Sequence, residues 1–162
     1  MQLSHFIRPL VNPDLTSPFF IIGTGRCGSS LLKRLLDSHK QLIGYPGEAN
    51  DLWHPNSYPF SLKTIESPAY VEHPREFSLL SVKNWPANYP DQINKVFSDY
   101  FHNKKQNKRN LVIKSAMISF ILPEIYSIFP KAKFIHIYRY GPSVIESFLL
   151  KEKMKEKGGY WR

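Results

Sequence analysis

The chain has 162 residues, of which 42% are apolar, and only one of them is a cysteine. This length and composition predict a single domain over residues 1–162 and exclude a disordered tail, an internal disulfide and a cysteine-rich zinc site. The net charge of +9 suits a polyanionic partner, but most of it comes from the lysine-rich runs 102–110 and 151–157, which are typical of solvated surfaces.

No apolar run is long enough to span a membrane, and the first eight residues lack the basic and apolar regions of a signal peptide. We therefore expect a cytoplasmic chain without a membrane span.

The first predicted element is a strand at 19–22, an unbroken apolar run between Pro18 and Gly23. Such a run is typical of a strand that is covered on both faces in a parallel sheet. The glycine-rich loop 23–30 follows. After the loop, helical spacing predicts an apolar helix face formed by Leu31, Leu32, Leu35 and Leu36.

The middle of the chain, 46–90, contains seven of the 13 prolines, which predicts an irregular excursion with short helical turns at most. Helical spacing returns over 93–101, and 111–113 is the next apolar strand candidate. Pro123 and Pro130 are expected to begin and end a further helix.

The last two predicted elements are a strand at 134–138 and a helix that begins at Gly141. Within the strand, we expect His136 to be buried and hydrogen-bonded rather than to bind a metal, because no second ligand stands at a suitable spacing. The apolar face of the helix is expected to contain Val144, Ile145, Phe148 and Leu149.

Alternating strands and helices predict an α/β fold with a mainly parallel sheet and flanking helices. In this architecture, ligands bind beyond the carboxyl ends of the strands. Three cations follow the three predicted strands: Arg26 in the glycine-rich loop, Lys114, and Arg139. Their convergence at one edge of the sheet predicts an anionic ligand.

The loop matches most of the nucleotide-phosphate pattern G-x-x-x-x-G-K-[ST] through Gly23, Gly28 and Ser30. Ser29, however, replaces the lysine, and Arg139 stands where an NTPase usually has the aspartate that holds magnesium. These differences disfavour a P-loop kinase or NTPase and favour metal-free anion transfer. A nucleic-acid binder, recognised by binding that weakens steeply with salt, is a further alternative that we do not favour.

Two spaced motifs resemble those of sulfotransferases that use 3′-phosphoadenosine 5′-phosphosulfate (PAPS). Segment 23–32 is similar to their 5′-phosphosulfate loop, and segment 138–147 is similar to their 3′-phosphate motif, with Arg139 and Ser147 eight residues apart. Glu48 and Lys114 resemble the base and the catalytic lysine of the carbohydrate and tyrosylprotein branches.

The resemblance implies a P-loop-NTPase-like sulfotransferase fold and sulfuryl transfer from PAPS to an acceptor hydroxyl of a carbohydrate, small molecule or protein tyrosine. It implies catalytic roles for Glu48, Arg26 and Lys114, with no metal and no nucleic-acid partner. The cofactor-binding residues that it implies are Gly25, Arg26, Cys27, Gly28, Ser29, Ser30, Arg139 and Ser147.

Three residues depart from the family pattern: Cys27 stands where serine is more usual, and Ser115 and Tyr140 stand where acids are frequent. Members of the family generally continue well beyond the 3′-phosphate motif. We therefore expect an N-terminal, C-terminally incomplete part of a sulfotransferase domain, and an inactive or partial PAPS-binding fragment is the alternative to an active enzyme. The sequence indicates neither the acceptor nor the oligomeric state.

Overall fold

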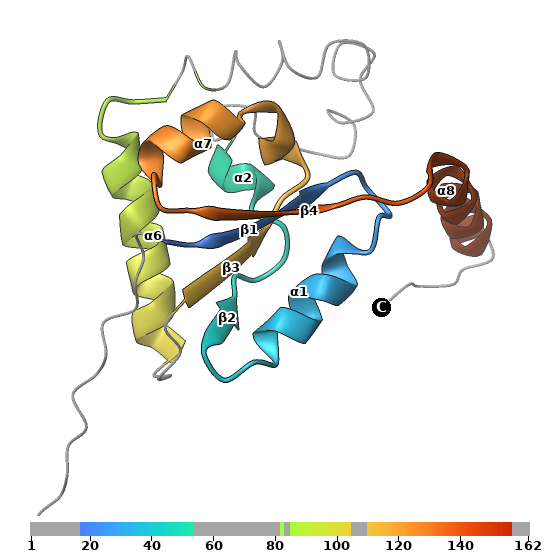
Figure 1. Cartoon of the computed structure of the whole chain (residues 1–162), viewed down its shortest axis with the longest axis horizontal. Helices are drawn as coiled ribbons and strands as arrows, with labels where there is room; N and C mark the ends of the chain where they lie inside the picture. Colours follow the sequence, from blue (N-terminus) through green and yellow to red (C-terminus); the bar gives the residue numbers. More distant parts are fainter. Residues whose placement is uncertain (1–16, 54–81, 83–84, 105–109, 157–162) are drawn as a thin grey trace, which may run out of the picture.

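The computed structural model describes residues 17–53, 82, 85–104 and 110–156 (Figure 1). Four strands alternate with helices along the chain. The elements, in order, are β1 (Phe19–Gly23), α1 (Ser29–Asp37), β2 (Leu42–Gly44), α2 (Asn50–Trp53), α6 (Tyr89–Lys104), β3 (Asn110–Lys114), the 3₁₀ helix η1 (Met117–Phe120), α7 (Leu122–Ile128), β4 (Lys133–Ile137) and α8 (Gly141–Glu156).

The four strands form one sheet in the order β2-β3-β1-β4, and every neighbouring pair is parallel. The connection from β1 to β2 runs toward one edge of the sheet, whereas the two later connections run toward the other. Because such crossovers are right-handed, α1 must cover one face and α2, α6, η1 and α7 the opposite face, as Figure 1 shows. The connections diverge between β1 and β3, so the carboxyl ends of these strands border a topological switch point.

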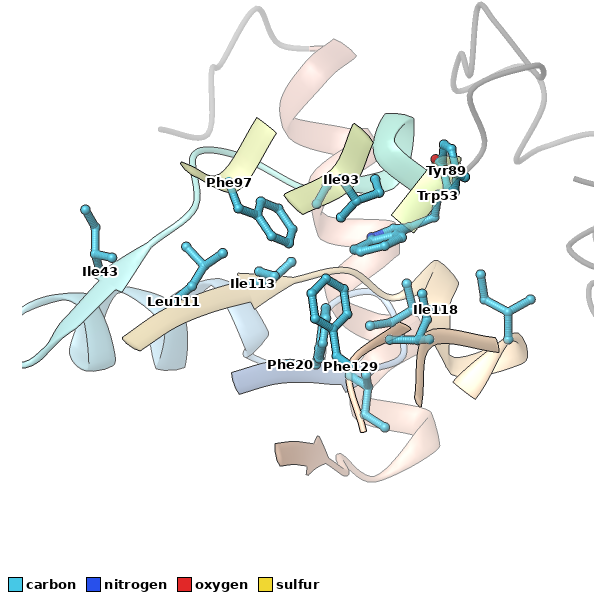
Figure 2. Packing of buried hydrophobic residues seen from close by; sticks show 14 of the residues in the cluster. Phe20, Ile43, Trp53, Tyr89, Ile93, Phe97, Leu111, Ile113, Ile118 and Phe129 are labelled. Carbon is cyan, nitrogen blue, oxygen red and sulfur yellow. The ribbon is translucent and has the colours of Figure 1, made fainter. Parts of the chain in front are cut away.

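The hydrophobic core lies between the sheet and the helices on the α6 face (Figure 2). Alternate residues of the strands, including Phe20 on β1 and Ile113 on β3, point into it, and Phe97 comes from α6. Trp53 is fully buried and meets the Phe20 ring edge-on, with 5.9 Å between the ring centroids. This packing holds α2, and therefore the chain just before it, against the sheet.

The structure confirms the α/β fold and the strands predicted at 19–22, 111–113 and 134–138. It adds β2, which has only three residues and too little periodicity to be recognised. Within the expected irregular excursion 46–90, α2 is a short helical turn and α6 already begins at Tyr89. Most of that excursion, 54–81 and 83–84, lies outside the described residues.

Three expectations about burial are wrong. Leu31 and Leu35 of α1 are 64% and 61% exposed, because α1 rests on the sheet through one narrow stripe and buries none of its residues fully. His136 is exposed rather than buried, because β4 is an edge strand of the sheet. On α8, Ile145, Phe148 and Leu149 of the predicted apolar face are likewise exposed.

No helix in the described part of the chain is both long enough and apolar enough to cross a membrane.

Candidate anion-binding site

The loop between β1 and α1 has a backbone that only particular residues allow. Gly23, at the end of β1, has φ +148°, and a Cβ there would lie 2.5 Å from the carbonyl oxygen of Ile137 on β4. Gly28, which precedes α1, has φ +104°. Arg26 adopts φ +63° although it is not a glycine, and this left-handed conformation costs about 1–2 kcal/mol. Strain of this size is found where surrounding contacts determine the backbone.

The amino end of α1 faces this loop without a side-chain cap. No side chain hydrogen-bonds to the helix end at Gly28, and the first turn contains no acidic residue. The amide groups of the first turn and the positive end of the helix dipole are therefore directed at the loop. This arrangement suits a phosphate or sulfate group.

Arg139, which lies between β4 and α8, and two residues of α8 hold the loop from its other side. Arg139 Nη1 donates a hydrogen bond of 3.0 Å to the main-chain oxygen of Arg26. Arg26 Nε in turn donates to Ser147 Oγ at 3.1 Å. A Cβ on Gly25 would lie 3.0 Å from the ring of Phe148, so α8 approaches the loop closely. These contacts explain how Arg26 is kept in its left-handed conformation.

Lys114, the last residue of β3, joins the loop to the chain that follows β2. Its Nζ donates a hydrogen bond of 3.0 Å to Ser30 Oγ and forms an ion pair with Glu48 Oε1. The Lys114 side chain is only 10% exposed, whereas that of Glu48 is 47% exposed. The main chain adds to this link, because the Ala49 N–H donates to the Lys114 carbonyl at 3.2 Å. The carboxylate thus faces solvent while the ammonium lies beneath it.

A polar cluster at the end of β2 supports the segment that carries Glu48. Asp37 Oδ1 accepts the Gly44 N–H at 2.6 Å, and Tyr100 Oη donates to the Gly44 carbonyl at 2.8 Å. A Cβ at Gly44 would lie 3.1 Å from both Asp37 Cγ and Lys33 Nζ. Burial lowers the pKa of the Lys33 amine; the Asp37 charge opposes this shift and the Lys114 charge adds to it.

The structure brings the sequence-predicted site residues into two adjoining groups. Arg26, Arg139 and Ser147 form one group, and Ser30, Lys114 and Glu48 form the other. Cations from the ends of all three predicted strands therefore do converge. The other predicted residues, Gly25, Cys27, Gly28 and Ser29, lie in the loop or at the start of α1, and the Cys27 side chain is buried.

Sequence reasoning missed Lys33, Asp37, Tyr100 and the approach of Phe148 to Gly25. Lys33 and Asp37 carry a weak signal, because they stand one and two helical turns after Ser29 on the same side of α1. No sequence signal marks Tyr100, since its hydrogen bond to Gly44 depends on the unpredicted strand β2.

Comparison with family models decides the relationship. The model described as "Sulfotransferase family" matches residues 18–161. The chain belongs to the sulfotransferase family. Among solved structures, the sulfotransferase STF1 from Mycobacterium tuberculosis H37Rv is similar at 19% identity and a TM-score of 0.36, over 76% of this chain and 45% of that one. This sulfotransferase chain thus spans less than half the length of that relative. No curated protein matches it.

Within the described part of the chain, no three histidine, cysteine, aspartate or glutamate side chains cluster as a metal site would require. The charged side chains of the site and of the cluster that supports it include Arg26, Arg139, Lys114 and Lys33 as cations and Glu48 and Asp37 as anions.

Proposed function

We propose that the chain carries the donor site of a PAPS-dependent sulfotransferase that transfers a sulfuryl group to an acceptor hydroxyl. The observation that carries this proposal is the convergence of Arg26, Lys114 and Arg139 around the uncapped end of α1 in a chain of this family. Three cations and a row of backbone amides suit a ligand with several phosphate and sulfate charges.

PAPS would supply the sulfuryl group and, as leaving group, adenosine 3′,5′-bisphosphate. In the proposal, the loop amides with Arg26, Ser29 and Ser30 bind the 5′-phosphosulfate, and the loop residues Gly25, Cys27 and Gly28 let the backbone follow it. Arg139 and Ser147 bind the 3′-phosphate. The direct hydrogen bond between Arg26 and Ser147 supports this assignment, because one residue proposed for each phosphate group takes part in it.

Glu48 is the proposed base. Its carboxylate is 47% exposed, so an acceptor hydroxyl can reach it from solvent and give up its proton there. Negative charge develops on the leaving phosphate during transfer, and Arg26 and Lys114 are positioned to stabilise it. The Lys114 ammonium lies in a largely dry position, where a fixed charge is worth more than in water, and loss of one such donor typically lowers a rate about 10²–10³-fold. In this proposal the cations act without a metal.

The exposure of Glu48 is compatible with several classes of acceptor. An exposed carboxylate admits a hydroxyl on a carbohydrate, a small molecule or a tyrosine side chain, and each of these acceptors fits the proposal.

Calorimetric titration with adenosine 3′,5′-bisphosphate tests the donor site. We expect this nucleotide to bind the chain more tightly than adenosine 5′-monophosphate or ATP, and the preference to be lost in Arg139→Ala. Lys131→Ala is the matched control, because it removes one exposed cation before β4 rather than after it. A folded chain that ignores the 3′-phosphate, or that prefers ATP with magnesium, would contradict the proposal.

A further inference from the structure

The proposed catalytic lysine and the proposed base are already engaged with each other. Lys114 Nζ contacts Glu48 Oε1 and Ser30 Oγ, so two of the three N–H donors of its ammonium point to these oxygens. Ser30 is the second residue of α1 and borders the loop. The ammonium therefore lies between the base and the region where a 5′-phosphosulfate would bind.

This position creates a competition for one cation. A carboxylate in an ion pair has part of its charge and one oxygen occupied, and it is a poorer acceptor for a hydroxyl proton than the same carboxylate without that partner. Sulfuryl oxygens bound at the amino end of α1 would be acceptors for the same ammonium. Because the Lys114 side chain is only 10% exposed, water competes weakly for it, and the choice is mainly between the two anions.

We propose that the Glu48–Lys114 ion pair is a latch that the sulfuryl group of the donor opens. Without the donor, Lys114 occupies the base. When sulfuryl oxygens draw the ammonium toward Ser30 and the loop, the ion pair opens, and the Glu48 oxygen that it occupied is able to accept the proton of the acceptor. The product adenosine 3′,5′-bisphosphate lacks the three sulfuryl oxygens and offers Lys114 only its 5′-phosphate, so it opens the latch less than PAPS does. This inference rests on the proposed function.

The latch predicts a difference in binding rather than in rate. In the wild type, part of the binding energy of PAPS is used to separate Lys114 from Glu48, and this cost is smaller for adenosine 3′,5′-bisphosphate. Glu48→Gln removes the competing charge. We expect this variant to bind PAPS about fivefold more tightly than the wild type, the factor that corresponds to an ion pair worth about 1 kcal/mol. Its affinity for adenosine 3′,5′-bisphosphate should increase by a clearly smaller factor.

The Lys114→Met background separates the latch from simple repulsion between Glu48 and the sulfuryl group. If Lys114 mediates the competition, Glu48→Gln has no effect on PAPS affinity once Lys114 is methionine. Lys114→Gln serves the same purpose if the methionine variant does not fold, as judged by circular dichroism. Asp99→Asn, which removes an exposed carboxylate paired with Lys95 on α6, is the matched control and should leave both affinities unchanged.

The titrations overturn the latch if Glu48→Gln leaves the PAPS affinity unchanged, weakens it, or strengthens both nucleotides equally. A gain for PAPS that persists in the Lys114→Met background also overturns it, because repulsion alone then explains the result. Failure of adenosine 3′,5′-bisphosphate to bind the wild type is a separate outcome. That result removes the proposed function, and the latch with it.

Discussion

Replacement of Gly23 by alanine tests the claim that the end of β1 must approach β4 without a side chain. Two costs add at this position. A positive φ of +148° disfavours any residue with a Cβ by about 1–3 kcal/mol. The new Cβ would also lie 2.5 Å from the Ile137 carbonyl oxygen and 3.1 Å from Cys27 Sγ, and relief of such overpacking typically costs about 1–3 kcal/mol more. We expect Gly23→Ala to lower the free energy of unfolding by about 2–6 kcal/mol.

Two other glycines separate these costs. Gly28 has φ +104°, but a Cβ there meets nothing within 4 Å, so Gly28→Ala should carry the backbone cost alone, about 1–3 kcal/mol. Gly141, at the start of α8, has neither a positive φ nor a neighbour within 4 Å. Its replacement by alanine should leave stability unchanged or raise it by up to about 1 kcal/mol.

Urea denaturation of the wild type and the three variants, followed by tryptophan fluorescence and circular dichroism, measures these free energies if the slopes with urea agree. The order of stability expected is Gly141→Ala, then Gly28→Ala, then Gly23→Ala. If Gly23→Ala and Gly28→Ala lose the same free energy, the close approach of β1 to β4 has no energetic consequence and the reasoning is refuted.

Two further predictions concern the support of the site. Tyr100→Phe removes the hydrogen bond to the Gly44 carbonyl and should cost about 1 kcal/mol at pH 7 in urea denaturation. Burial raises the pKa of Tyr100, so above about pH 10 the folded state keeps a proton that the unfolded state loses, and wild-type stability falls as the pH rises further. The Tyr100→Phe variant should lack this part of the fall. An identical pH profile for the two proteins would contradict the assignment. Trp53→Ala empties a fully buried site against Phe20 and should cost about 3–5 kcal/mol by the same measurement, whereas a loss below 1 kcal/mol would show that α2 is not anchored there.

The convergence of Arg26, Lys114 and Arg139 could be predicted because parallel strands end at the same edge of a sheet. Apolar runs locate the three strands. Lys114 and Arg139 directly follow two of these strands, and Arg26 stands in the short loop after the third, so all three can be placed at that edge without knowledge of the strand order. The contact between Arg26 and Ser147 could not be predicted in this way. It depends on the angle at which α8 leaves β4, and helical periodicity contains no information about that angle.

The errors in burial have a related cause. Periodicity shows which residues of a helix share a side, but not how much of that side a neighbour covers, and Leu31 and Leu35 remain exposed for that reason. His136 was misjudged because an apolar strand looks the same in sequence whether it is central or at an edge. The cluster around Gly44 could not be predicted from the sequence, since the strand that creates it has three residues and is too short to show a hydrophobic pattern.

The hydrogen bonds of the site join residues that are far apart in the chain: 121 positions for Arg26 and Ser147, 113 for Arg139 and Arg26, and 84 for Lys114 and Ser30. No short peptide from this protein can therefore reproduce the site, and partial unfolding at β4 removes the contacts of Arg139 and Ser147 with Arg26. A bound anion would in turn oppose the opening of that edge strand. Slower amide hydrogen exchange in β4 should accordingly accompany ligand binding, although the ligand lies beyond the end of the strand.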